Sequence, residues 1–186
     1  MSILVIGPSS SGKSTYLKHI NAKKIYFGGQ LLNKTEIPES GYIHYNLLHF
    51  ALTFQKQNVL IPADWDLMKE SILKKIIDSG KVSRAIIIIC QLDQIKKRIE
   101  NRIYIEEKIN PGKYPKDLWK NIYYQINLNF IYLRLFDLLK KISLNCEYVI
   151  SQENKNFEII KDLNLVKKFL NIDTNNYKNG NWQLRR

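Results

Sequence analysis

The chain has 186 residues, of which 45% are hydrophobic and 25% charged, as is usual for a soluble globular protein of one domain, here 1–186. Its 29 Lys and Arg residues outnumber its 17 Asp and Glu residues, and the net charge of +12 suits phosphate-bearing ligands. The basic residues are dispersed in small groups and form no basic tail, so the charge does not by itself indicate nucleic-acid binding.

Apolar runs in the sequence are too short to cross a bilayer, so we expect no contact with a membrane. A functional pattern begins at Gly7, which leaves no room for a signal or transit peptide, and a reducing cytoplasm is the expected location. Cys90 and Cys146 have neither metal nor redox spacing and are expected to pack as small buried residues.

The first predicted elements are a strand, a loop and a helix. Residues 2–6 are apolar and predict a buried strand, and residues 7–14 read Gly-Pro-Ser-Ser-Ser-Gly-Lys-Ser. This is the Gly-x-x-x-x-Gly-Lys-Ser/Thr pattern of a phosphate-binding loop. A helix predicted over 13–21 completes the strand–loop–helix context that the pattern requires, which disfavours a mere Gly/Ser turn. The sequence therefore predicts a nucleoside triphosphate site.

Each residue type in this loop has a physical role. Gly7 and Gly12 permit backbone conformations that wrap amide N–H groups around phosphate oxygens. Lys13 places a positive charge against the β- and γ-phosphates, and Ser14 offers its hydroxyl as a Mg²⁺ ligand. ATP and Mg²⁺ are thus the predicted cofactors. The predicted nucleotide-binding residues are Gly7, Ser9, Ser10, Ser11, Gly12, Lys13, Ser14 and Thr15.

The rest of the chain alternates between strand and helix patterns, which indicates the α/β class with a parallel sheet. With the first strand, the predicted strands number five, the others lying near 24–27, 58–62, 84–90 and 146–151. The later helices are predicted over 43–56, 66–79, 91–108 and 117–142. The aromatic residues of the last helix are expected to pack in the core. Residues 109–116 are rich in turn formers and predict a mobile loop.

In this layout the chain resembles the small phosphate-loop kinases, namely the nucleoside and nucleotide kinases, adenylylsulfate kinase and their relatives. The resemblance covers the whole layout, whereas the phosphate loop is the specific motif. It implies a single-domain kinase fold with a five-stranded parallel sheet flanked by helices and a helical lid at about 98–116. An Asn-Lys-x-Asp guanine-reading element is missing, which argues against a regulatory GTPase. The strand near 84–90 is not followed directly by Asp, which argues against a motor or transporter ATPase.

The resemblance also implies catalytic residues beyond Lys13. In these kinases the helix after the fourth strand carries arginines that reach the transferring phosphate, and Arg98 and Arg102 stand at the matching place, four residues apart on one helix face. The alternative is that both are solvated surface residues. Asp64, after the strand predicted at 58–62, is a candidate for holding the Mg²⁺ shell or for accepting a hydroxyl proton. The equal alternative is that Asp64 is a helix N-cap, a role that Asp66 could also have.

Acceptor-binding residues are predicted at the start of the helix expected over 43–56, which borders the acceptor site in such kinases. His44, Tyr45 and Asn46 offer stacking and hydrogen bonding there, with core and capping roles as the alternatives. The chain departs from adenylylsulfate kinases after the second strand, where Phe27-Gly28-Gly29-Gln30 lacks their acidic motif.

The predicted function is ATP- and Mg²⁺-dependent transfer of the γ-phosphoryl group to a hydroxyl of a small, anionic, nucleotide-like acceptor. Within the family, the Ser-Ile-Leu-Val-Ile-Gly opening and the Ile-His-Tyr-Asn-Leu-Leu segment look like the cytidine diphosphoramidate kinases of capsule biosynthesis, which implies the ribose 3′-hydroxyl as acceptor. The alternative is a nucleotide-dependent switch or NTPase module that acts on nucleic acid or on a protein partner, nucleic acid being the less favoured of the two. The sequence allows a homodimer as well as a monomer.

Overall fold

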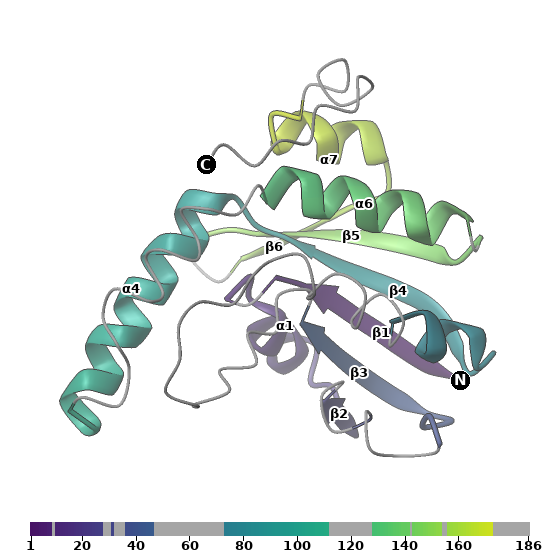
Figure 1. Cartoon of the computed structure of the whole chain (residues 1–186), viewed down its shortest axis with the longest axis horizontal. Coiled ribbons are helices and arrows are strands. Elements are labelled where there is room, and N and C mark those ends of the chain that lie inside the picture. The colour runs from purple at the N-terminus through teal and green to yellow at the C-terminus, as the bar shows by residue number, and fades with distance from the viewer. Residues whose placement is uncertain are drawn as a thin grey trace, which may run out of the picture.

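Six strands form one sheet in the order β2-β3-β1-β4-β5-β6, with helices on both of its faces (Figure 1). The computed structural model describes residues 1–8, 10–27, 31, 36–46, 73–111, 128–141, 143–153 and 156–172. The elements are β1 (Ser2–Gly7), α1 (Lys13–His19), β2 (Ile25–Phe27), β3 (Gly41–Asn46), β4 (Val82–Ile89), α4 (Leu92–Ile109), α6 (Leu128–Lys141), β5 (Asn145–Ser151), β6 (Phe157–Ile160) and α7 (Leu163–Phe169). Residues 73–78 are also helical.

The central strand of the sheet is β1, which pairs in parallel with β3 on one side and β4 on the other. Strands β2 and β5 extend the parallel arrangement outward, so the carboxyl ends of five strands lie along the same edge. In Figure 1 this edge is on the left, where α4 begins. Open parallel sheets bind ligands at this edge, beside the strand from which the chain connections diverge. The loop after β1 occupies that place.

The predicted α/β class is confirmed, but two details of the predicted sheet are wrong. Residues Gly41–Asn46 form β3 rather than the start of a helix over 43–56, because a segment with Tyr42, Ile43 and Tyr45 can be buried on both faces between β1 and β2. Among the described residues the sheet has six strands rather than five parallel ones, since β6 pairs antiparallel with β5 and Gln152 N–H donates to Asn156 O at 3.0 Å beside this pair.

Other predicted elements agree wherever the structure describes them. The helix predicted over 91–108 is α4, the one over 117–142 contains α6, and residues 73–78 fall within the helix predicted over 66–79. The predicted strand at 58–62 and residues 47–56, 66–72 and 117–127 of the predicted helices lie outside the described residues.

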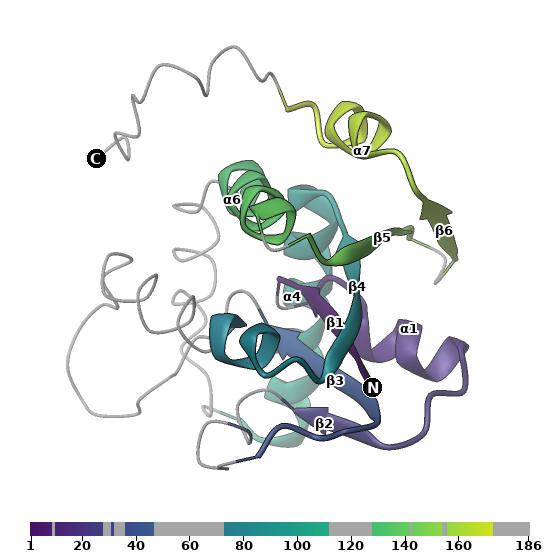
Figure 2. The same ribbon diagram turned by 90° about the vertical axis from the view of Figure 1, so that its right-hand side faces the viewer.

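The strands divide their side chains between two cores. Leu4 and Ile6 of β1 point into the larger core, which is covered by α6, α7, the first half of α4 and helix 73–78. Val5 points into the smaller core, which α1 covers with Tyr16 and Leu17. Figure 2 shows α1 on one side of the sheet and α6 on the other. Because α1 packs directly on β1, the loop between them is anchored at both ends.

A buried tyrosine ties α6 to the carboxyl end of β4. The Tyr132 hydroxyl donates to Ile88 O and accepts from Cys90 N–H, each at 3.1 Å, and the residue is fully buried. Its ring also stacks on Phe136, so these aromatic side chains of α6 belong to the core as predicted. Cys90 is buried and Cys146 half-buried, and burial raises the pKa of each thiol to about 11.

We expect Tyr132→Phe to lower the free energy of unfolding by about 1–3 kcal/mol, because it leaves a buried N–H and a buried carbonyl without this hydroxyl. Urea denaturation with an unchanged m-value measures the loss. Tyr104→Phe is the matched control: Tyr104 is 61% exposed on α4, and its change should stay within about 0.5 kcal/mol. Equal stability of the two variants would contradict a structural role for the Tyr132 hydroxyl.

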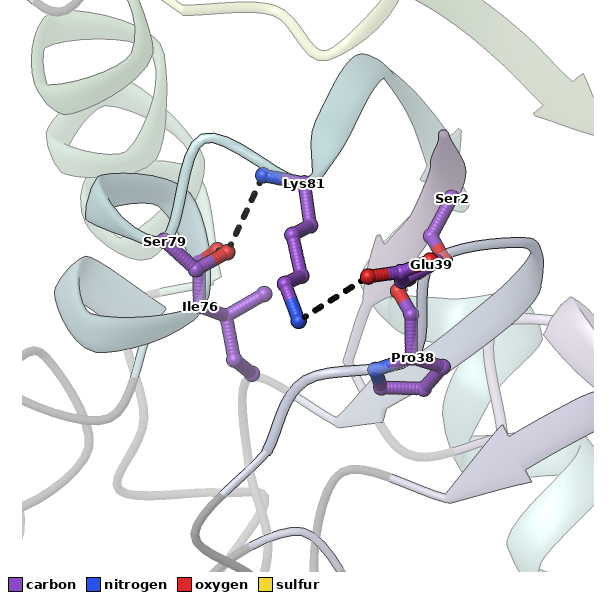
Figure 3. Close-up of polar contacts among 6 residues, drawn as sticks. All are labelled: Ser2, Pro38, Glu39, Ile76, Ser79 and Lys81. Atoms are coloured by element: carbon purple, nitrogen blue, oxygen red, sulfur yellow. Dashed lines mark hydrogen bonds and ion pairs between the residues drawn. The ribbon is translucent and has the colours of Figure 1, made fainter.

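The amino edge of the sheet is closed by local polar contacts, which gather Ser2, the segment before β3 and the turn before β4 (Figure 3). Ser2 Oγ donates to Pro38 O at 2.6 Å, Lys81 N–H donates to Ser79 Oγ at 3.2 Å, and Lys81 Nζ pairs with Glu39 at 3.6 Å. These contacts link turns to strand ends and bring no cluster of cations together. The loop after β1 lies at the opposite, carboxyl edge of the sheet.

Candidate phosphate-binding site

The loop between β1 and α1 adopts a backbone that its sequence pattern requires. Gly12 has φ 103°, in the left-handed region where a side chain is strained, and a Cβ there would lie 2.6 Å from Ser151 Oγ. A Cβ on Gly7 would lie 2.8 Å from Ile88 O. The two glycines thus let the loop bend while it touches the ends of β4 and β5, and a larger residue at either position would displace it.

Lys13 opens α1 and turns its side chain back into the loop. Its Nζ donates to Gly7 O at 3.0 Å and to Pro8 O at 2.6 Å, and the residue is only 3% exposed. Burial lowers the pKa of the Lys13 ammonium to about 7, and the positive charge of Arg102 acts in the same direction. A bound phosphate would oppose both effects and favour the charged form of this amine.

Serine hydroxyls flank the lysine. Ser11 is fully buried, and its Oγ is without a hydrogen-bond partner among the described residues, an unusual condition for a buried hydroxyl. Ser14 is exposed, and its Oγ lies 3.2 Å from His44 Nε2. Thr15 is half-buried in α1, whereas Ser9 lies outside the described residues. Bent glycine backbone, a buried ammonium and an orphaned hydroxyl together fit a phosphate group.

The three predicted acceptor-binding residues lie on β3, and strand alternation separates them. His44 is on the α1 side, where it contacts Ser14 and the ring of Phe27 at 5.2 Å between centroids. Tyr45 points to the opposite face, where it is 5% exposed in the larger core and burial raises its pKa strongly. Asn46 is half-buried and in register with Gly7. His44 and Asn46 are therefore beside the loop, and Tyr45 has the core role.

Arg98 and Arg102 both come from α4, but their surroundings differ. Arg98 Nη1 donates to Ser10 O at 3.3 Å and to Ser11 O at 3.0 Å, and Nη2 donates to Gln152 O at 2.9 Å. Arg102 is 62% exposed, with Nε 3.9 Å from Glu106, and its charge still affects the pKa of Lys13. Arg98 is thus no solvated surface residue, and Arg102 lies within electrostatic reach of the loop.

The predicted lid region begins within α4. This helix is continuous to Ile109, so residues 98–109 are helical, and residues 112–116 lie outside the described part. Ile95 and Ile99 bury the first half of the helix, whereas Tyr104, Ile105 and Ile109 in its second half are exposed. Figure 1 shows α4 extending beyond the carboxyl edge of the sheet.

Three residues near the loop were not among those predicted from the sequence. Phe27, at the end of β2, is 48% exposed beside His44, while Ser151 and Gln152 lie at the end of β5 against Gly12 and Arg98. The position of Phe27 at a strand end was a usable signal, since carboxyl ends of parallel strands meet at one edge. For Ser151 and Gln152 no local motif exists, because their proximity depends on the pairing of β4 with β5.

Of the residues predicted to hold Mg²⁺, the structure describes Ser14. Ser14 offers an exposed hydroxyl, which fits a hard cation that takes oxygen ligands and shares substrate phosphates. Within the described ranges, no group of three His, Cys, Asp or Glu residues could hold a metal by itself. Asp93 is 90% exposed and pairs with Lys96, whereas Asp64 and Asp66, the predicted carboxylates, lie outside the described residues. Ser14 is thus one ligand that would need phosphate oxygens and water beside it.

Comparison with protein-family models, with curated proteins and with solved structures finds no match to this chain. Among the helices that the structure describes, none combines the length and the apolar character needed to span a membrane. The assignment of a function therefore depends on the chemistry of the loop and of the residues around it.

Proposed function

We propose that the protein is an ATP- and Mg²⁺-dependent phosphotransferase that moves the γ-phosphoryl group to a hydroxyl of a small, anionic, nucleotide-like acceptor. One observation carries the proposal: two cationic side chains, those of Lys13 and Arg98, contact the carbonyls of the loop after β1, and the charge of Arg102 lowers the pKa of Lys13. Phosphoryl transfer needs positioning and charge stabilisation rather than covalent participation by the protein. A loop bound by two cations, with a third cation on the neighbouring helix α4, suits both needs.

Individual residues have separate tasks in this proposal. Lys13 exchanges the carbonyls of Gly7 and Pro8 for phosphate oxygens when the nucleotide binds, and so compensates their charge. Ser14 contributes its hydroxyl to Mg²⁺, which when bound neutralises phosphate charge, and His44 holds that hydroxyl in place. Arg102, on the exposed side of α4, is the candidate for stabilising charge on the transferring group.

The acceptor is proposed to bind beside β2 and β3. Phe27 presents a half-exposed ring there and contacts His44, which in turn contacts Ser14 of the phosphate loop. An aromatic ring near the phosphate loop suits an acceptor with a nucleobase, because bases stack on such rings. Cytidine diphosphoramidate, with its ribose 3′-hydroxyl, is the acceptor that the resemblance of the sequence favours.

A ligand panel tests the proposed function. Thermal shifts are measured with nucleosides, nucleoside mono- and diphosphates, nucleotide sugars and cytidine diphosphoramidate, each with and without Mg²⁺ and a non-hydrolysable ATP analogue. Transfer from γ-labelled ATP to each stabilising compound follows. We expect a phosphorylated acceptor to stabilise the protein and to become labelled. Labelling of nucleosides or neutral sugars equal to that of their phosphates would contradict an anionic acceptor.

A nucleotide-dependent switch or NTPase module is the competing function, because the phosphate-loop pattern of residues 7–14 is also the nucleotide site of such proteins. Such a protein would hydrolyse ATP without labelling any small acceptor. Stimulation of hydrolysis by nucleic acid or by a protein partner, with every small acceptor unlabelled, would replace the kinase proposal by this one.

We expect Phe27→Ala to raise the KM for the acceptor by about tenfold or more, because base–aromatic stacking contributes about 1–3 kcal/mol. The KM for ATP should remain within about twofold of wild type, since Phe27 has no contact with the loop backbone among those described. Steady-state kinetics with each substrate varied in turn separate the two constants.

The control for this variant is Ile25→Ala. Ile25 lies two residues before Phe27 on β2, on the same side of the strand and 36% exposed, but toward the amino end. Its acceptor KM should equal that of wild type. Equal increases in both variants would show that the edge strand is destabilised and that Phe27 has no special role.

A further inference from the structure

The guanidinium group of Arg98 joins three segments that are far apart in the sequence. Its Nη1 donates to the carbonyls of Ser10 and Ser11 in the loop and lies 3.3 Å from Cys90 Sγ at the end of β4. Its Nη2 donates to Gln152 O in the turn between β5 and β6. Loop, β4 and the β5–β6 turn are therefore connected through one side chain of α4.

The contacts with Ser10 and Ser11 determine which way the loop amides face. A trans peptide unit is planar, so its carbonyl and the following N–H point in opposite directions. When Arg98 holds Ser11 O, the N–H of Gly12 is turned away from Arg98. The carbonyls of Gly7 and Pro8 are held in turn by Lys13. The carbonyl oxygens of Gly7, Pro8, Ser10 and Ser11 are thus bound by cations, as a site with amides directed at an anion requires.

The loop needs such support because part of its backbone is strained. Ser10 has φ 62°, in the left-handed region that residues other than glycine seldom adopt. A conformation of this kind persists when surrounding contacts determine it. In the proposed function Lys13 binds phosphate oxygens, so its bonds to Gly7 O and Pro8 O break when a nucleotide binds. The bonds of Arg98 to Ser10 O and Ser11 O are on the side of the loop away from the phosphates and persist.

We infer that Arg98 is a positioning residue, which keeps the phosphate loop in its binding conformation and couples it to the β5–β6 turn, instead of contacting the transferring phosphoryl group. This inference rests on the proposed function for the identity of the ligand. Both Nη atoms of Arg98 are committed to carbonyls, and Arg102, one turn further along α4, remains the arginine for the transition state. Preorganisation of this type raises affinity for the ligand.

The test uses Arg98→Ala and Arg98→Lys in the full chain, with a non-hydrolysable ATP analogue as the probe. Loss of charge-assisted bonds to two loop carbonyls should raise the Kd of the analogue about tenfold or more in Arg98→Ala, while kcat at saturating ATP falls less than the affinity does. Hydrogen exchange at the amides of residues 10–12 should accelerate. Arg98→Lys keeps the charge but lacks the planar fork, so it should recover only part of the affinity.

Lys97→Ala is the matched control. Lys97 also links α4 to the β5–β6 turn, through Glu153 at 3.1 Å, but this pair is exposed and makes no contact with the loop among the interactions described. Its analogue affinity and its exchange rates at residues 10–12 should equal those of wild type. Equal effects in Lys97→Ala and Arg98→Ala would overturn the inference, because the tie between helix and turn would then suffice.

Two other outcomes would also overturn it. A thousandfold loss of kcat in Arg98→Ala with unchanged analogue affinity would place Arg98 at the transferring phosphate, and wild-type values throughout would remove any role. If Arg98→Ala does not fold, as judged by circular dichroism, Arg98→Lys decides between the same results. A wild-type protein that binds the analogue but labels no acceptor contradicts the proposed function alone, since affinity and exchange still report on Arg98.

Discussion

Replacement of Lys13 by methionine is expected to reduce kcat/KM for phosphoryl transfer by on the order of a thousandfold, because it removes the buried cation that we propose to bind the nucleotide phosphates. Methionine is preferable to alanine here. Lys13 is buried, so alanine would remove the packing of its stem along with its charge. With methionine the stem is retained, and the loss can be assigned to the ammonium.

The fold should survive this substitution. Burial already lowers the pKa of Lys13 to about 7, so the folded state accommodates the charged ammonium at a cost that methionine does not incur. Circular dichroism and turnover are measured on the same sample, beside Lys18→Met as the control. Lys18 is an exposed lysine of the same helix and should leave both unchanged. Turnover of Lys13→Met within tenfold of wild type would remove the assignment of the loop.

Replacement of Arg102 by alanine is expected to lower kcat by on the order of a thousandfold, the usual loss when phosphoryl transfer is deprived of an arginine that stabilises the transition state. The affinity for a non-hydrolysable ATP analogue should change by about twofold at most, because charge on the transferring group develops only during the reaction. This pattern is the reverse of the one expected for Arg98, although both side chains come from one face of α4.

The positive charge of Arg102 lowers the pKa of Lys13, and its ion pair with Glu106 spans 3.9 Å. Single-turnover rates and analogue affinity are compared with those of Lys108→Ala, which removes another cation of α4, placed over the ring of Tyr104. Lys108→Ala should match wild type. An unchanged kcat in Arg102→Ala would place this arginine on the solvated surface, and a switch or NTPase function would gain support.

Local patterns in the sequence determined the start of the fold and the phosphate loop. Gly12 supplies the bend of the loop, Gly7 the close approach to β4, and Lys13 the charge. All three lie within a few residues of one another, and the structure has all three. The strand predicted near 84–90 is β4, because its continuous apolar run is a local pattern that indicates burial on both faces.

The tertiary structure alone decided where the other candidate residues lie. Gly41–Asn46 is a strand because β1 and β2 pair with it, and this alternation places His44 beside Ser14 and Tyr45 in the core. Arg98 meets Ser10 across 88 positions of sequence, and Ser151 meets Gly12 through the order of the strands. Spacing along the chain records dihedral preferences and burial, whereas such contacts arise from the pairing of whole elements, which no short pattern contains.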